Sequence, residues 1–128
     1  MLNLYFKFRK AVSLFFVSKL HRKNIFLNLK EPVVSFTFDD IPRSAITNGE
    51  SILKRYNFSG TYYISPELMK ANGFDFDRKD VHILQQIVEG GGELACHTYS
   101  HLHFFRSDRK QIVSDIEKNQ QFIEKCID

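Results

Sequence analysis

Residues 33–40 read VVSFTFDD, an apolar run that ends in two adjacent carboxylates, Asp39 and Asp40. The run mixes β-branched and aromatic residues without strict alternation, which is typical of a strand buried on both faces of a parallel sheet. A second stretch, residues 93–101, reads ELACHTYSH and carries His97 and His101 four positions apart. Two imidazoles and one carboxylate suit a divalent metal and leave a position open for water. Together the two stretches predict a metal site with a base beside it.

The pattern around these stretches alternates between helical and extended segments. We expect a loop and helix at 44–56, a strand at 60–65, a loop with Pro66 and Gly73, a helix at 77–89 stopped by glycines 90–92, a strand at 93–97, and a helix at 108–125 capped by Ser107 with Ile112, Ile116 and Ile123 on one side. This order predicts parallel strands with right-handed crossovers, whose carboxyl ends meet at one edge. Both motifs follow strand ends, so we expect them to share that edge.

The first 30 residues differ in charge from the rest. They carry seven Lys or Arg and no acid, whereas residues 31–128 carry eleven Lys or Arg against fifteen acids. Leu4, Phe8, Ala11, Val12 and Phe15 fall on one face of a predicted amphipathic helix at 4–20. Such a leader can pack on the domain, contact an anionic membrane or bind nucleic acid. We expect no nucleic-acid partner, and we leave peripheral membrane contact through residues 4–20 open.

Composition sets the class of protein. The 128 residues are 43% hydrophobic and 14% aromatic, enough to build the core of one globular domain. Cys96 and Cys126 do not form a disulfide framework and say nothing about compartment. The apolar run at 11–18 is too short to span a bilayer and has no cleavage site after it, so we expect neither a signal peptide nor a membrane span. On that basis we expect the cytoplasm or its membrane face.

Both motifs resemble those of a known family. Thr37-Phe38-Asp39-Asp40 and residues 97–101 resemble the first two motifs of the polysaccharide deacetylase family, the NodB-homology domain of carbohydrate esterase family 4. The sequence around the two motifs also resembles that family, notably residues 60–64 and Asp115-Ile116-Glu117 with Asn119 after it. The resemblance covers residues 33–125, which suggests a leader at 1–30 and the amino-terminal part of a deacetylase domain at 31–128.

This resemblance implies a fold, a cofactor and a reaction. The fold would be α/β, a partial distorted (β/α) barrel of the glycoside hydrolase/deacetylase type, preceded by the amphipathic helix. The cofactor would be a divalent metal, usually zinc, held by Asp40, His97 and His101. The reaction would be hydrolysis of N-acetyl groups on an acetylated amino-sugar oligomer or polysaccharide, with Asp39 as the catalytic base. Ligand and base are separate because a carboxylate engaged on zinc is a weak base.

The chain departs from the family pattern in two ways, which leave three hypotheses open. Ile41 stands where the family often has glycine, and the family's later motifs would follow Asp128. The chain is therefore expected to be part of a deacetylase that is cut short here. Alternatively, it is a non-catalytic metal- or sugar-binding remnant of that fold, or a membrane-surface module that acts through its basic leader. His21, His82 and His103 lack the motif spacing and are taken as structural or solvated.

Overall fold

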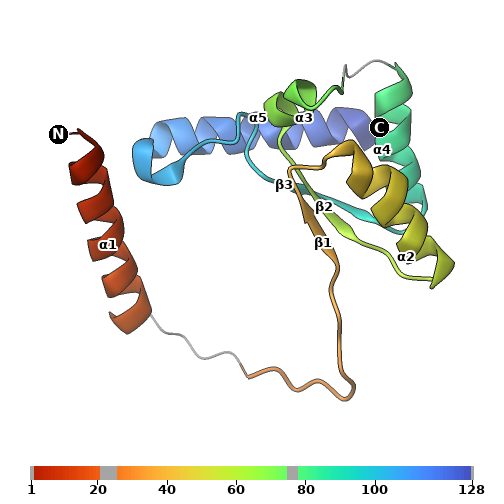
Figure 1. Ribbon diagram of the computed structural model, residues 1–128, viewed down its shortest axis with the longest axis horizontal. Coiled ribbons are helices and arrows are strands. Elements are labelled where there is room, and N and C mark those ends of the chain that lie inside the picture. The colour runs from red at the N-terminus through yellow and green to blue at the C-terminus, as the bar shows by residue number, and fades with distance from the viewer. Residues whose placement is uncertain (1, 21–25, 75–77, 128) are drawn as a thin grey trace. The chain divides into compact units, whose positions relative to one another are not determined.

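The structure, a computed structural model, describes residues 2–20, 26–74 and 78–127 (Figure 1). It divides into two compact units, one of Met1–Val33 with His103–Ser107 and one of Val34–Leu102 with Asp108–Asp128. The first unit holds helix α1 (Leu2–Leu20) and the short 3₁₀ helix η2 (Phe104–Arg106). All the other helices and strands belong to the second unit, which also carries both motifs.

The second unit is built on a three-stranded parallel sheet of order β1-β2-β3, as the alternating pattern predicts. Its strands are β1 (Thr37–Asp39), β2 (Thr61–Ile64) and β3 (Glu93–Cys96). Asp39 lies opposite Tyr63, and Ile64 lies opposite Cys96. The carboxyl ends of β1 and β3 therefore lie at the same edge of the sheet, on either side of the end of β2. Asp40 and His97 are the next residues after those ends.

Strand β1 is shorter and less buried than expected. The prediction of a strand at 33–38 is wrong for its first four residues, because pairing begins only at Thr37. Val33 and Val34 are 70% and 72% exposed. Thr37 and Asp39 are also exposed, which contradicts burial on both faces. In the described sheet β1 is an edge strand, and β-branched residues gain little from extended structure without neighbours to pack on.

Five helical segments complete the second unit: a π-helix η1 (Ala45–Glu50), α2 (Ser51–Arg55), α3 (Pro66–Ala71), α4 (Arg78–Glu89) and α5 (Arg109–Ile127). Helix α3 lies where the sequence predicts a loop. Its signal was Pro66 followed by Glu67, because proline is favoured in the first helical turn and acids there interact well with the helix dipole. Helices α4 and α5 pack on each other and on β3 (Figure 1).

The end of α4 agrees with the sequence prediction, whereas α5 begins with a different cap from the predicted one. At the end of α4, Gly91 has φ +85°, and the amides of Gly91 and Gly92 donate to Val88 and Ile87, a Schellman motif. The prediction that Ser107 caps the last helix is wrong. Asp108 is the cap, since its carboxylate accepts from the Gln111 amide at 2.9 Å while the Gln111 side chain accepts from the Asp108 amide at 2.9 Å.

The hydrophobic core of the described residues lies in the second unit. Its buried members are Ile41, Tyr62, Ile64, Met69, Phe74, Leu84, Ile87, Ile123 and Cys126. Burial raises the pKa of the Cys126 thiol. Burial also raises the pKa of Tyr62, and so does the neighbouring Glu50 carboxylate, which accepts a hydrogen bond from the phenol. The prediction that Ile116 lies on the buried side of α5 together with Ile123 is wrong, because Ile116 is 39% exposed. The buried stripe of α5 instead contains Asp115, Asn119, Ile123 and Cys126.

Helix α1 in the first unit begins and ends close to the predicted 4–20. Large apolar side chains on it are exposed, among them Leu4, Phe8 and Phe15 at 74%, 67% and 60%. Among the described helices, α1 included, none has both the length and the apolar character that a bilayer crossing requires. The amphipathic character of α1 stays a prediction.

Candidate metal centre

The first motif leaves β1 through a bend at Asp40 and Ile41, whose φ angles are +61° and +32°. Positive φ is strained for a residue with a side chain, and most of all for a β-branched one. Ile41 is nevertheless fully buried in the core. Burial of a side chain of this size contributes about 1.5–3 kcal/mol, which is comparable to the strain. The core therefore holds the segment that carries Asp40.

Arg43 ties the same segment to α4. Its guanidinium donates to the Gly73 carbonyl at 2.6 Å and to both carboxylate oxygens of Asp80 at 3.3 Å, and it lies 4.5 Å from the centre of the Phe74 ring. Asp80 is only 3% exposed, and a carboxylate buried to that degree needs a cationic or hydrogen-bonding partner. Sequence reasoning assigned no role to Arg43, because its partners lie more than 25 residues along the chain.

The second motif forms a tight turn after β3. The His97 amide donates to the Ile64 carbonyl at 2.9 Å, which extends the pairing of β3 with β2 by one residue. Thr98 and His101 have φ +62° and +53°, and the Thr98 hydroxyl accepts from the Leu102 amide at 2.8 Å. Of the five non-glycine residues with positive φ in the described part of the chain, four lie in the two motif segments. Such strain tends to gather at functional sites.

The two segments bring three ligand atoms together. Nε2 of His97 lies 3.2 Å from Oδ1 of Asp40, and Nε2 of His101 lies 3.3 Å from the same oxygen. One candidate ligand atom from each of the three residues lies within 4.8 Å of the other two. Oδ1 of Asp40 is shielded from solvent and has no hydrogen-bond partner among the described residues. Buried carboxylate oxygens are costly without a partner, so this atom needs a cation or a donor.

The donor set and its spacing fit a small divalent ion. A tetrahedral ion with ligand bonds of 2.0–2.1 Å holds its ligand atoms about 3.3 Å apart, close to both distances from Asp40. The same distances also suit an ion pair if an imidazole is protonated. A pair of imidazoles with a carboxylate is a common donor set for zinc and neighbouring transition metals. The side chains are 31% exposed at His97 and 51% at His101, so the site is open to solvent.

The other predicted residues lie outside this cluster. Asp39 is exposed at the end of β1 and directly precedes the candidate ligand Asp40 in the sequence. His82 is exposed on α4, where a ring nitrogen lies 3.3 Å from the Gln86 amide, and His103 is exposed in the first unit. His21 lies outside the described residues.

Two polar residues of α5 support the second motif, and sequence reasoning gave them no role in the site. Asp115 accepts hydrogen bonds from Ser100, and Asn119 donates to the Ile64 carbonyl at 2.7 Å. Both are buried, at 8% and 0% exposure. The available signal was their spacing, because residues 115, 119, 123 and 126 fall on one helical stripe with Ile123 and Cys126. A polar residue on such a stripe must have a partner inside the fold.

Fold and site together define an α/β protein with a candidate metal centre at the carboxyl edge of a parallel sheet. The sequence profile described as "Polysaccharide deacetylase" matches residues 27–128, which is most of the chain. The chain belongs to the polysaccharide deacetylase family. The resemblance inferred from the two motifs is thereby confirmed. A divalent metal is the cofactor that this family generally uses, and Asp40, His97 and His101 form a candidate site for one.

Individual relatives support this assignment. The chain is 29% identical over 87 residues to a bifunctional xylanase/deacetylase of Pseudobutyrivibrio xylanivorans, covering 68% of this chain and 13% of that protein. It is 26% identical over 98 residues to a peptidoglycan-N-acetylglucosamine deacetylase of Bacillus cereus, covering 76% and 42%. The chain thus spans less than half the length of either relative.

Solved structures agree on the fold. The Xyl-CE4 domain of a multidomain xylanase from the hindgut metagenome of Trinervitermes trinervoides superposes with a TM-score of 0.61 at 26% identity, covering 73% of this chain and 42% of that one. The predicted α/β class is confirmed as a mixed helix and sheet fold shared with such domains. The partial barrel and the division at residue 30 stay predictions.

Proposed function

We propose that this chain carries the metal-binding part of a hydrolase that removes N-acetyl groups from an amino sugar or polysaccharide. The observation that carries the proposal is the convergence of three donor atoms from Asp40, His97 and His101 at the end of the sheet. Two ligands come from one turn and the third from a separate strand end, so the site exists only in the folded chain. Family membership supports the reaction class.

In this proposal the three residues hold a divalent ion, with zinc as the first choice. When bound, such an ion supplies Lewis acidity to an acetamide carbonyl and to water. Asp40 and the two histidines fix where that charge sits, and the exposure of His101 leaves room for a substrate to approach. An Asp-His-His set does not select strongly among divalent ions, so cobalt and manganese are the alternatives.

Asp39 is proposed as the general base. It is an exposed carboxylate next in sequence to Asp40, and it does not belong to the three-residue cluster. A carboxylate free of the metal keeps its basicity and can take a proton from the water that attacks the acetamide carbonyl. In this proposal Asp40 binds the ion, and the adjacent Asp39 accepts the proton.

The proposed substrate is an acetylated amino-sugar oligomer or polysaccharide. The relative from Bacillus cereus is named for peptidoglycan N-acetylglucosamine, and the relative from Pseudobutyrivibrio xylanivorans for a deacetylase joined to a xylanase. These names support a carbohydrate substrate but differ on which one. Because this chain spans less than half of either relative, the activity of the whole protein is part of the proposal.

The adjacent carboxylates allow a matched test. Asp39→Asn and Asp40→Asn make the same isosteric change at neighbouring positions, so we would measure zinc stoichiometry and acetate release from an N-acetylglucosamine oligomer for both. We expect Asp39→Asn to keep one zinc per chain and lose turnover, and Asp40→Asn to lose both. Zinc without acetate release in the unmodified chain would favour the non-catalytic metal-binding alternative. Turnover by Asp39→Asn equal to that of the unmodified chain would contradict the base assignment.

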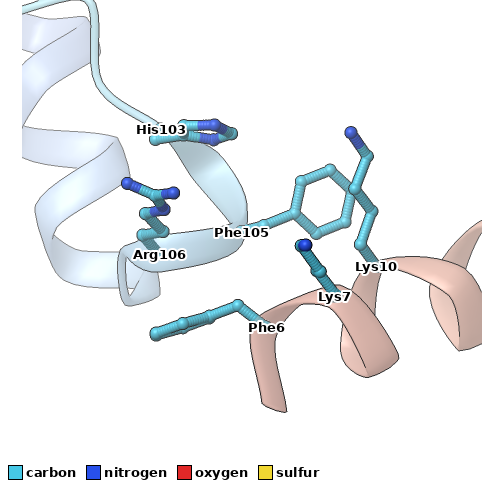
Figure 2. A pocket seen from close by; sticks show the side chains of 6 residues that line it. All are labelled: Phe6, Lys7, Lys10, His103, Phe105 and Arg106. Atoms are coloured by element: carbon cyan, nitrogen blue, oxygen red, sulfur yellow. The ribbon is translucent and has the colours of Figure 1, made fainter. Parts of the chain in front are cut away.

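We also propose that α1 contacts an anionic membrane surface. Leu4, Phe8 and Phe15 lie exposed on the predicted apolar face. Figure 2 shows Lys7 and Lys10 of α1 beside Phe105, in a pocket that Arg106 also lines. Apolar side chains with nearby cations and no acid in residues 1–30 match the chemistry of anionic lipid.

Vesicle binding tests this second proposal. We expect the chain to bind phosphatidylglycerol vesicles more tightly than phosphatidylcholine vesicles, and a Phe8→Ser/Phe15→Ser variant to lose most of that binding. Ile52→Ser on α2, where Ile52 is 52% exposed in the other unit, is the matched control and should bind like the unmodified chain. Equal binding to both lipids, or no effect of the double substitution, would overturn the proposal.

A further inference from the structure

Helix α5 places a carboxylate against the turn that joins the two histidines. Asp115 lies on the buried stripe of α5 and is 8% exposed. Its Oδ2 accepts from the Ser100 amide at 3.0 Å and its Oδ1 accepts from the Ser100 hydroxyl at 2.8 Å. Both carboxylate oxygens are thus used on one residue, which fixes the position and orientation of Ser100. Hydrogen bonds to a charged group contribute more than hydrogen bonds between neutral groups.

Ser100 directly precedes His101, whose backbone is strained at φ +53°. A residue in that region keeps its conformation only if its surroundings hold it there. The other end of the turn depends on the same helix, because the Ile64 carbonyl that accepts from the His97 amide also accepts from the Asn119 side chain. Helix α5 therefore contacts both ends of the segment that carries the imidazoles.

We propose that Asp115 is a positioning residue for the metal site, which acts through Ser100 to hold the His101 imidazole opposite Asp40. This inference rests on the proposed function, since it assumes that Asp40, His97 and His101 bind the ion. Asp115 is not one of the three ligand residues, and it holds the backbone beside one of them. Residues that orient metal ligands commonly change metal affinity by about 10–100-fold when they are removed.

Cobalt binding to the full 128-residue chain tests the inference, because the visible spectrum of the bound ion reports its coordination geometry. We expect Asp115→Ala to weaken cobalt binding about 10–100-fold and to change that spectrum. Ser100→Ala removes only the hydroxyl contact and should weaken binding about twofold to tenfold. Asp115→Asn keeps the size and one acceptor, so it should recover part of the affinity.

Two comparisons separate positioning from general damage. Glu117→Ala removes an exposed carboxylate from the same helix and should leave affinity and spectrum unchanged. The double variant Asp115→Ala/Ser100→Ala should bind no more weakly than Asp115→Ala, since the hydroxyl has then lost its acceptor. Circular dichroism without metal shows whether each variant is folded at the temperature of the titration, and Ser100→Ala is the mild substitution if Asp115→Ala is not.

The outcomes distinguish this inference from the proposed function. If the unmodified chain binds no cobalt, the proposed metal site is wrong and the inference falls with it. If the unmodified chain binds one cobalt and the Asp115 and Ser100 variants match Glu117→Ala in affinity and spectrum, the metal site stands and Asp115 is only a structural residue. Weaker binding with an altered spectrum in Asp115→Ala and Ser100→Ala, both folded, supports the inference.

Discussion

The two segments that supply the candidate ligands are held in place by different forces. The segment at 40–43 is anchored by burial of Ile41 and by the contacts of Arg43 with Asp80 and Phe74. The turn at 97–102 is held by directional hydrogen bonds through Thr98, Ser100 and the backbone of His97. Burial of Ile41 is not directional and fixes position mainly through packing, and the hydrogen bonds of Arg43 act three residues away from Asp40. The hydrogen bonds of the turn act on residues directly beside the imidazoles and also fix their orientation.

This difference separates two kinds of defect. Changes in the first segment other than at the ligand Asp40 should lower the free energy of unfolding and leave the metal affinity of the folded molecules nearly unchanged. Changes in the turn should cost less stability and more affinity, because two of the three ligands belong to it.

Ile41→Ala should lower the free energy of unfolding by about 2–5 kcal/mol, because it opens a cavity in the core. Ile41→Gly removes still more side chain but relieves the strain at φ +32°. We therefore expect the glycine variant to be at least as stable as the alanine variant, as measured by urea unfolding. A glycine variant clearly less stable than the alanine variant would show that backbone strain is unimportant at this position.

Arg43→Ala should lower the free energy of unfolding by about 1–3 kcal/mol, because it takes a charged partner from the buried Asp80 carboxylate. Arg43→Lys keeps the charge but not the planar fork over Phe74, so it should recover only part of the loss. Zinc affinity of the folded variants should stay within about twofold of that of the unmodified chain. A twofold change corresponds to a free energy near the lower limit for the loss of one hydrogen bond. A larger drop in zinc affinity would contradict the expectation that Arg43 acts on stability and not on metal binding.

Parts of the fold and of the candidate metal site could be predicted from the sequence, and others could not. The order of β2, α4 and β3 was predictable because glycines and periodicity are local signals. The meeting of Asp40 with His97 and His101 was predictable because parallel strands end at one edge. The start of β1 was not, since pairing with β2 rather than composition decides where it begins. The contact of Asp115 with Ser100 depends on the rotation of α5 about its axis, which is a property of tertiary packing.

Thr98→Ala should have a smaller effect on stability, about 1 kcal/mol, because the Leu102 amide loses its acceptor. Thr98→Ser keeps the hydroxyl and removes the β-branch at positive φ, so it should be as stable as the unmodified chain. Despite the modest cost, Thr98→Ala should weaken zinc binding more than Arg43→Ala does. The reverse order, measured by competition with a chromophoric chelator, would contradict the account of the turn.

The central claim is that Asp40, His97 and His101 form one metal site. Its most direct test is calorimetric titration of zinc into the metal-free chain and into single alanine variants of the five histidines. We expect one zinc per chain, lost in His97→Ala and in His101→Ala and retained in His21→Ala, His82→Ala and His103→Ala. Stoichiometric zinc retained by His97→Ala, or no zinc bound by the unmodified chain, would contradict it.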